Sequence, residues 1–153
     1  MHGKETATFQ QITTESPLYA QALQLRYALF FEMHHLPFET VFDDLEATSQ
    51  HFAFADHENI LAYGRLSALS NGSMKISQMV VAQEVQQQGF GSMLLNRIVE
   101  HADHLDTKKI ELNARIQAIS MYEKAGFISV GNIYLSKSTQ VEHIRMVRLL
   151  SCK

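Results

Sequence analysis

The stretch MKISQMVVAQEVQQQGFGSMLLNRIVEHADHL, residues 74–105, decides how this chain folds. Residues 74–81 alternate between apolar and polar side chains and then become wholly apolar, which is typical of a central strand. From Gly89 to about Leu105 the apolar residues recur at helical spacing, so we expect a long amphipathic helix there. A strand that leads through a glycine-containing loop into a helix predicts a sheet with helices packed on its faces.

The rest of the chain adds strands and helices on both sides of this stretch. Ser16 followed by Pro17 indicates a helix start, because serine caps free N–H groups and proline fits the first helical turn. Strands alternating with helices in the middle of the chain predict a mixed α/β sheet. The other expected elements are a helix from Pro17 to about Phe31, a loop over residues 32–50, strands over residues 7–13, 51–55, 60–66, 109–113, 127–135 and 141–149, and a helix over residues 116–125 closed by Gly126.

The composition is that of an ordinary globular domain. The chain has 153 residues, 46% hydrophobic and 19% charged, with two prolines and no linker or repeat, so we expect a single domain over residues 1–153. The net charge of −3, with scattered basic residues, indicates neither a nucleic-acid partner nor a membrane partner. Its one cysteine, Cys152, allows no disulfide within the chain, and no apolar leader or membrane-spanning run is apparent. We therefore expect a cytoplasmic protein.

The loop QQQGFGS, residues 86–92, lies between the expected central strand and the long helix. Free N–H groups and the positive dipole at a helix start bind anions, and glycines let a phosphate approach the backbone closely. The loop fits neither the dinucleotide pattern Gly-x-Gly-x-x-Gly, because residue 94 is leucine, nor a P-loop, which needs Gly-Lys-Ser/Thr. Two interpretations stay open at this point: a phosphate-binding loop, or tight packing of the helix against the strand.

A second motif, NARIQAISMYEKAGF at residues 113–127, follows the next expected strand. The two motifs in this order resemble the acyl-CoA pyrophosphate loop and the following helix of the GNAT superfamily of N-acetyltransferases. The resemblance departs from the family at Gln86, where many relatives have arginine, and at Arg115, where many have asparagine or glutamine. Backbone amides of the loop can still supply most of the phosphate contacts.

Weaker matches extend the resemblance over nearly the whole chain. The segments LRYALFFE at residues 25–32 and HIRM at residues 143–146, and Asp44 with His51, are similar to the ElaA-like branch of that superfamily. The resemblance implies a GNAT-type fold, with a mixed, mostly antiparallel central sheet of about six or seven strands flanked by about four helices.

The activity that the resemblance implies is transfer of an acetyl group from acetyl-CoA to a primary amine, on a small molecule or a protein, by direct attack in a ternary complex. Acetyl-CoA would be a co-substrate, and no metal would be needed. A catalytically silent acyl-CoA-binding or regulatory domain stays open as the alternative, and so does a homodimer. The implied coenzyme A-binding residues are Met79, Val80, Val81, Gln86, Gln87, Gln88, Gly89, Phe90, Gly91, Ser92, Asn113, Ser120 and Tyr122.

Three residues are expected to catalyse the transfer. The resemblance places Tyr122 near the acyl sulfur as the acid that helps the thiolate leave, although a tyrosine at helical spacing can also simply pack against the sheet. A base must remove the proton of the attacking ammonium. Several carboxylates are open for this role, and we expect His143, which titrates closest to neutral pH, and its neighbour Glu142.

The acceptor pocket is expected in the region of residues 26–51, with Arg26, Phe30, Glu32 and Asp44 as binding residues. Phenylalanines mixed with carboxylates there favour a cationic amine, although core packing explains the aromatic residues as well. The histidines do not predict a metal site: His101 and His104 could share a helix face, but no third ligand stands at zinc spacing.

Overall fold

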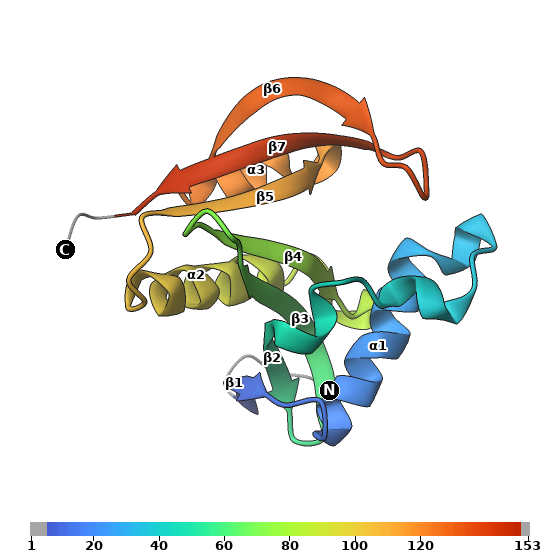
Figure 1. The fold of residues 1–153 in the computed structure, drawn as a ribbon. Helices are drawn as coiled ribbons and strands as arrows, with labels where there is room; N and C mark the ends of the chain where they lie inside the picture. Colours follow the sequence, from blue (N-terminus) through green and yellow to red (C-terminus); the bar gives the residue numbers. More distant parts are fainter. Residues whose placement is uncertain (1–5, 151–153) are drawn as a thin grey trace.

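The structure is a computed structural model that describes residues 6–150, so Cys152 lies outside the described part. Figure 1 shows two groups of strands that diverge, with helices packed against them. The strands are β1 (Ala7–Ile12), β2 (Gln50–Asp56), β3 (Asn59–Ala68), β4 (Met74–Val81), β5 (Lys109–Arg115), β6 (Ile128–Leu135) and β7 (Glu142–Leu149). The α-helices are α1 (Pro17–Phe30), α2 (Phe90–Asp103) and α3 (Ile119–Lys124).

All seven strands form one sheet in the order β1-β2-β3-β4-β5-β7-β6. Only β4 and β5 pair in parallel, and every other neighbouring pair is antiparallel. The predicted mixed, mostly antiparallel sheet is therefore confirmed. Three α-helices, rather than four, accompany it in residues 6–150. The stretch after α1 contains three short 3-10 turns instead, η2 (Glu32–His34), η3 (Phe38–Val41) and η4 (Glu46–Thr48).

Local signals fix the start of α1, while long-range pairing fixes the end of β5. The Ser16 hydroxyl accepts the N–H of Leu18 at 3.2 Å and Pro17 opens the helix, as predicted. β5 runs two residues past its predicted end, because Arg115 still pairs with His143 of β7. The following helix is shorter than predicted and starts only after a 3-10 turn, η6 (Ile116–Ala118).

The two faces of the sheet carry different layers. On one face α2 packs against β2, β3 and β4, and its side chains Leu94, Leu95 and Ile98 are fully buried in the main core. On the other face α1 packs against β3 and β4 over a smaller core. Figure 1 shows α1 beside the β1–β4 half of the sheet, so the α1 face of β5, β7 and β6 has no helix over it.

A bulge in β4 opens the middle of the sheet. Arg65 of β3 pairs with Ser77 and Tyr63 pairs with Val80, so two residues of β4 lie opposite Gly64 alone. One of the two, Gln78, has a φ of 60°, which bends the strand. A Cβ on Gly64 would lie 2.5 Å from the Met79 sulfur, so any other residue there would force the Met79 and Ile98 side chains to move.

Beyond the first two residues of β4, β4 and β5 no longer pair. Their only paired positions are Met74 with Ile110 and Lys75 with Glu111, after which the strands diverge (Figure 1). The sheet is therefore split between β4 and β5, and the split is open to both faces. In residues 6–150 no helix is both long and apolar enough to cross a membrane.

Candidate active site

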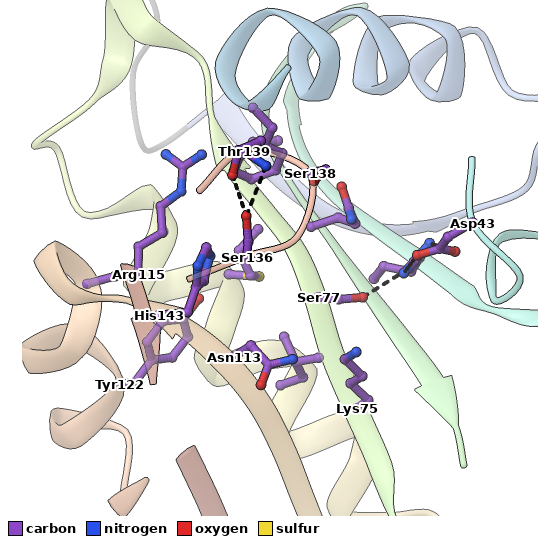
Figure 2. Close-up of a pocket in the computed structure, with 18 of the residues that line it drawn as sticks. Asp43, Lys75, Ser77, Asn113, Arg115, Tyr122, Ser136, Ser138, Thr139 and His143 are labelled. Carbon is purple, nitrogen blue, oxygen red and sulfur yellow. Dashed lines mark hydrogen bonds and ion pairs between the residues drawn. The ribbon is translucent and has the colours of Figure 1, made fainter. Parts of the chain in front are cut away.

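The split between β4 and β5 holds a cavity of about 360 Å³. The cavity receives side chains from both faces of the sheet, and Figure 2 shows ten of its polar residues around it. Its lining from the α2 and α3 face comprises Ile76, Met79, Val81, Gly91, Ala118, Met121 and Tyr122. Its lining from the α1 face comprises Phe30, Phe31, Asp43, Arg65, Lys75, Ser77, Gln78, Val80, Asn113, Arg115, Tyr134, Ser136, Ser138, Thr139 and His143.

The loop before α2 is shaped for an anion. Gln87 and Gly89 both have positive φ values, 67° and 89°, and no side chain caps the first turn of the helix. The backbone N–H groups of this first turn are therefore open to a ligand, at the positive end of the helix dipole. Gln86 donates a hydrogen bond to the Val81 carbonyl at 3.2 Å, which ties the loop to the end of β4.

Gly91 brings the start of α2 close to the cavity. A Cβ at this position would lie 3.4 Å from both the Met121 sulfur and a methyl group of Val81, tighter than most side-chain contacts. The missing side chain therefore lets the first turn of α2 form part of the cavity wall. Phe90, in contrast, is buried in the main core and stacks at a tilt on Phe54, with ring centroids 6.2 Å apart.

Tyr122 lies in the wall of the cavity on α3. Its ring packs edge-on against Phe127 at 6.0 Å, and only 7% of the residue is exposed. Burial raises the pKa of its hydroxyl to about 12, against the opposing effect of the Arg115 guanidinium. Within residues 6–150 the hydroxyl has no hydrogen-bond partner, so it is a protonated donor available to a bound group.

His143 lies in β7 and also lines the cavity (Figure 2). Its Nδ1 is 2.8 Å from the Val141 carbonyl, which accepts a hydrogen bond when Nδ1 carries the proton. This arrangement leaves Nε2 as the basic nitrogen. Tyr134 stacks on the imidazole at 5.9 Å and restrains the ring.

A buried network of charges supports the α1 side of the cavity. The Glu46 carboxylate accepts hydrogen bonds from Arg26 at 2.8 and 2.9 Å, from Arg65 at 2.7 Å and from Tyr19 at 2.6 Å. Arg65 also binds both oxygens of Asp43, at 2.7 and 2.8 Å, and donates to Ser77 at 3.0 Å. The network fastens residues 43–46 of the loop to α1, β3 and β4.

The charges in this network compensate one another. Burial opposes ionisation of Glu46, but the hydrogen bonds from Arg26, Tyr19 and Arg65 and the charges of the arginines outweigh it and lower the pKa to about 2. Burial and the bond to Glu46 raise the pKa of Tyr19 to about 12. For Asp43, burial is again outweighed by Arg65, which lowers the carboxyl pKa. Two arginines thus face two carboxylates.

The comparisons with known proteins identify one family. A family model described as "Acetyltransferase (GNAT) domain" matches residues 6–150. This chain belongs to the GNAT acetyltransferase family. It is therefore an enzyme of the acyltransferase class, and the resemblance on the sequence motifs is confirmed.

Individual GNAT relatives agree with this assignment. Protein ElaA of Escherichia coli K12 is 27% identical over 87% of this chain and 88% of its own. The crystal structure of E. coli ElaA superposes with a TM-score of 0.78 at 25% identity, over 93% of this chain and 99% of that one. An acyl-CoA N-acyltransferase from Pseudomonas aeruginosa gives a TM-score of 0.76 at 29% identity, over 93% and 97% of the two chains.

A more distant GNAT protein, from Elizabethkingia anophelis, shares the fold at 16% identity. Its TM-score is 0.71, over 96% of this chain and 100% of that one, and its crystal structure contains acetyl-CoA.

The structure gathers some of the predicted GNAT site residues at the cavity and leaves others outside its lining. Of the expected coenzyme A set, Met79, Val80, Val81, Gly91, Asn113 and Tyr122 line the cavity. The remaining members are outside it: Gln86, Gln87, Gln88, Gly89, Phe90 and Ser92 form the loop and first turn of α2, and Ser120 is exposed on α3. Asn113 lies in β5, so it is not a helix cap.

Some of the expected acceptor and base residues also line the cavity, and others do not. Phe30 and His143 line the cavity. Glu142, Glu32 and Asp44 are exposed and lie outside the lining, and Arg26 is completely buried in the Glu46 network. The acid that reaches the cavity is Asp43, the neighbour of the predicted Asp44.

Sequence reasoning missed Glu46 and Arg65, which organise this side of the site. One signal for Arg65 was available: it stands in the apolar run of residues 60–66, and a charge inside a buried strand must have a partner. In the described part of the chain no three His, Cys, Asp or Glu side chains gather as metal ligands. His101 contacts Gln50 at 2.8 Å, and His104 bonds to the Glu100 carbonyl at 2.7 Å.

Proposed function

We propose that this GNAT acyltransferase transfers the acetyl group of acetyl-CoA to a primary amine by direct attack in a ternary complex. The observation that carries the proposal is the split in the sheet. Its cavity is reached from the loop before α2, which suits an anion, on one face and from a polar surface on the other. Two substrates can therefore enter from opposite faces and meet between β4 and β5.

The loop before α2 and the free edge of β4 fit coenzyme A. The open N–H groups around Gly89 suit a pyrophosphate, which binds well at a helix N-terminus. After Lys75 the edge of β4 that faces β5 has no strand partner, so its peptide groups near Val80 and Val81 are open to the amides of a pantetheine arm. The acetyl-CoA in the E. anophelis structure agrees with such a ligand for this fold.

We assign His143 the removal of the amine proton. Its Nε2 is the basic nitrogen as long as Nδ1 donates to Val141. The attacking nitrogen must lose a proton as its lone pair forms the bond to the acetyl carbon, and an unprotonated imidazole nitrogen can accept it. Glu142 lies outside the cavity lining, so we give it no role in this step.

We assign Tyr122 the stabilisation of the departing sulfur. Breaking the carbon–sulfur bond leaves a thiolate, whose conjugate thiol has an ordinary pKa of about 8.5. The pKa of Tyr122 is raised to about 12, so its hydroxyl holds its proton more firmly than the thiol does. Tyr122 therefore donates a hydrogen bond to the thiolate rather than its proton, and the sulfur is protonated by water afterwards.

Calorimetric titration with acetyl-CoA tests the first part of the proposal. We expect micromolar binding of acetyl-CoA and none of ATP or NAD, because the loop lacks both nucleotide fingerprints. Loss of acetyl-CoA in the presence of an amine panel tests turnover. Binding without turnover on any amine would favour the silent acyl-CoA-binding alternative, and no binding would remove the proposal. A cytoplasmic location and a homodimer stay predictions.

A further inference from the structure

The floor of the cavity on the α1 face holds three hydrogen-bond donors with nothing to bind. Lys75 and Ser77 point to the same face because they are two residues apart on β4, and Asn113 stands on β5 across the split. Figure 2 shows the side chains of Lys75 and Ser77 on β4 and that of Asn113 on β5 across from them. All three line the cavity.

These donors have no acceptor in the described chain. Neither Lys75 nor Asn113 makes a hydrogen bond or ion pair with any of residues 6–150. The Ser77 oxygen accepts from Arg65 at 3.0 Å, which leaves its own O–H free to donate. An ammonium, a hydroxyl and an amide N–H that line one cavity can together bind an anion.

The nearby carboxylates are already engaged. Glu111 is the strand partner of Lys75, but its carboxylate binds Arg145 at 2.9 Å and lies 3.9 Å from Lys109. Asp43 is held by both terminal nitrogens of Arg65. Within residues 6–150 no carboxylate therefore pairs with Lys75 at the cavity, although the chain as a whole carries a net charge of −3.

A second uncompensated cation stands at the other end of the cavity. The Arg115 guanidinium lies over the Phe30 ring, 4.6 Å from its centroid, and has no carboxylate partner among residues 6–150. Of the carboxylates that favoured a cationic amine in the sequence, Glu32, Glu39 and Asp44 are outside the lining, and Asp43, which lines the cavity, is paired with Arg65. The charge of the cavity is thus opposite to the one that the sequence favoured.

We propose that the acceptor is a small amine that also carries an anionic group, a carboxylate or a phosphate, which Lys75, Ser77 and Asn113 bind. The inference rests on the proposed acetyl transfer and names its substrate class. Coenzyme A does not account for these donors, because its pyrophosphate site is at the start of α2, on the opposite face. A cavity of about 360 Å³, shared with the acetyl arm, admits a small molecule.

Matched amine pairs that differ only in the anion test the proposal. We would compare β-alanine with its amide and phosphoethanolamine with ethanolamine, and include spermidine as a cationic amine and a neutral tripeptide as a protein-like acceptor. We expect kcat/KM to be at least tenfold higher for one of the anion-bearing members than for its partner without the anion. Preference for spermidine, for the members without the anion or for the peptide would overturn the proposal.

Variants of Lys75 connect the preference to this residue. Lys75→Gln should lower kcat/KM for the anion-bearing acceptor at least tenfold, leave that of its partner without the anion unchanged and erase the preference, whereas Lys75→Arg should retain most of it. The control is Lys108→Gln, an exposed lysine outside the cavity, which should change nothing. Equal preference in Lys75→Gln and the wild type would refute the assignment.

Coenzyme A affinity separates this inference from the proposed function. Lys75→Gln should bind acetyl-CoA as tightly as the wild type, and a drop in that affinity would show that Lys75 serves the coenzyme instead. Where no amine is turned over, calorimetry of the coenzyme A-loaded protein with the same pairs decides. Binding of an anionic member then supports the anion site even without catalysis, and failure of both to bind rejects it.

Discussion

The two faces of the sheet at the split differ in how they are built. On the α2 face an apolar helix seals the main core, and the site there depends on backbone shape: a loop with two positive φ angles and a glycine at its mouth. On the α1 face the site depends on side-chain charge. Two arginines, Arg26 and Arg65, pair with the carboxylates of Asp43 and Glu46, and Lys75 and Arg115 line the cavity without a carboxylate partner in residues 6–150. A change in backbone geometry should therefore disrupt the site on the α2 face, and a change in charge pairing should disrupt the site on the α1 face.

Removing the charge of Glu46 should give the largest effect, on the α1 face. Glu46→Gln leaves two buried arginines with one carboxylate, so we expect a loss of about 3 kcal/mol in the free energy of unfolding. Urea titration measures it. The same loop offers matched controls: Asp43→Asn, whose side chain is 45% exposed, should cost less, and the exposed Asp44→Asn almost nothing. Equal losses in all three would contradict the role of Glu46.

The same carboxylate predicts a loss of stability in acid. The pKa of Glu46 is lowered from 4.5 to about 2, so its contribution is complete above about pH 4.5 and disappears as the pH falls through about 2. Wild type should therefore lose free energy of unfolding across this window more steeply than Glu46→Gln. Parallel pH curves for the two proteins would show that Glu46 does not titrate as described.

Distorting the backbone of the loop on the α2 face should weaken the binding of acetyl-CoA. Gly89→Val puts a branched residue at φ 89°, and we expect at least a hundredfold loss of acetyl-CoA affinity by calorimetry. Gly72→Val makes a matched control, because Gly72 has a φ of 84° with no atom near its missing Cβ and lies far from the loop in sequence. The control should lose stability but keep its affinity for the coenzyme.

Tyr122→Phe removes the hydroxyl that we assign to the departing thiolate. We expect kcat to fall about 10- to 100-fold, because the hydroxyl acts on the thiolate only as it departs. Affinity for acetyl-CoA and the melting temperature should stay nearly unchanged, since the ring still packs on Phe127. Undiminished turnover would remove Tyr122 from the mechanism.

His143→Gln should have the smallest effect of the series. Glutamine can keep a polar contact at the cavity but cannot accept the amine proton, so we expect about a tenfold fall in kcat at neutral pH. Raising the pH should restore much of the rate, because more of the amine is then already neutral. A rate deficit that stays constant with pH would show that His143 positions the substrate and is not the base.

Much of the fold could be predicted because its signals are local. The Ser16-Pro17 start of α1, the alternation in β4 and the helical spacing in α2 depend on residues a few positions apart. Predictions deviated where distant segments meet: β5 extends to Arg115 because β7 pairs with it, which shortens the next helix. For the site, the glycine loop and Tyr122 were marked by a motif, whereas Asp43 could not be told from Asp44 by type or spacing.

The sequence by itself determined the order of strands and helices, the glycine loop and the family, because periodicity and short motifs record local backbone preference. Only the tertiary structure decided where the sheet splits, which acid reaches the cavity, and that Lys75 stands there without a counter-charge. Charges separated by tens of residues compensate one another only after the chain has folded. The charge of the acceptor site is therefore a property of the assembled sheet rather than of any stretch of sequence.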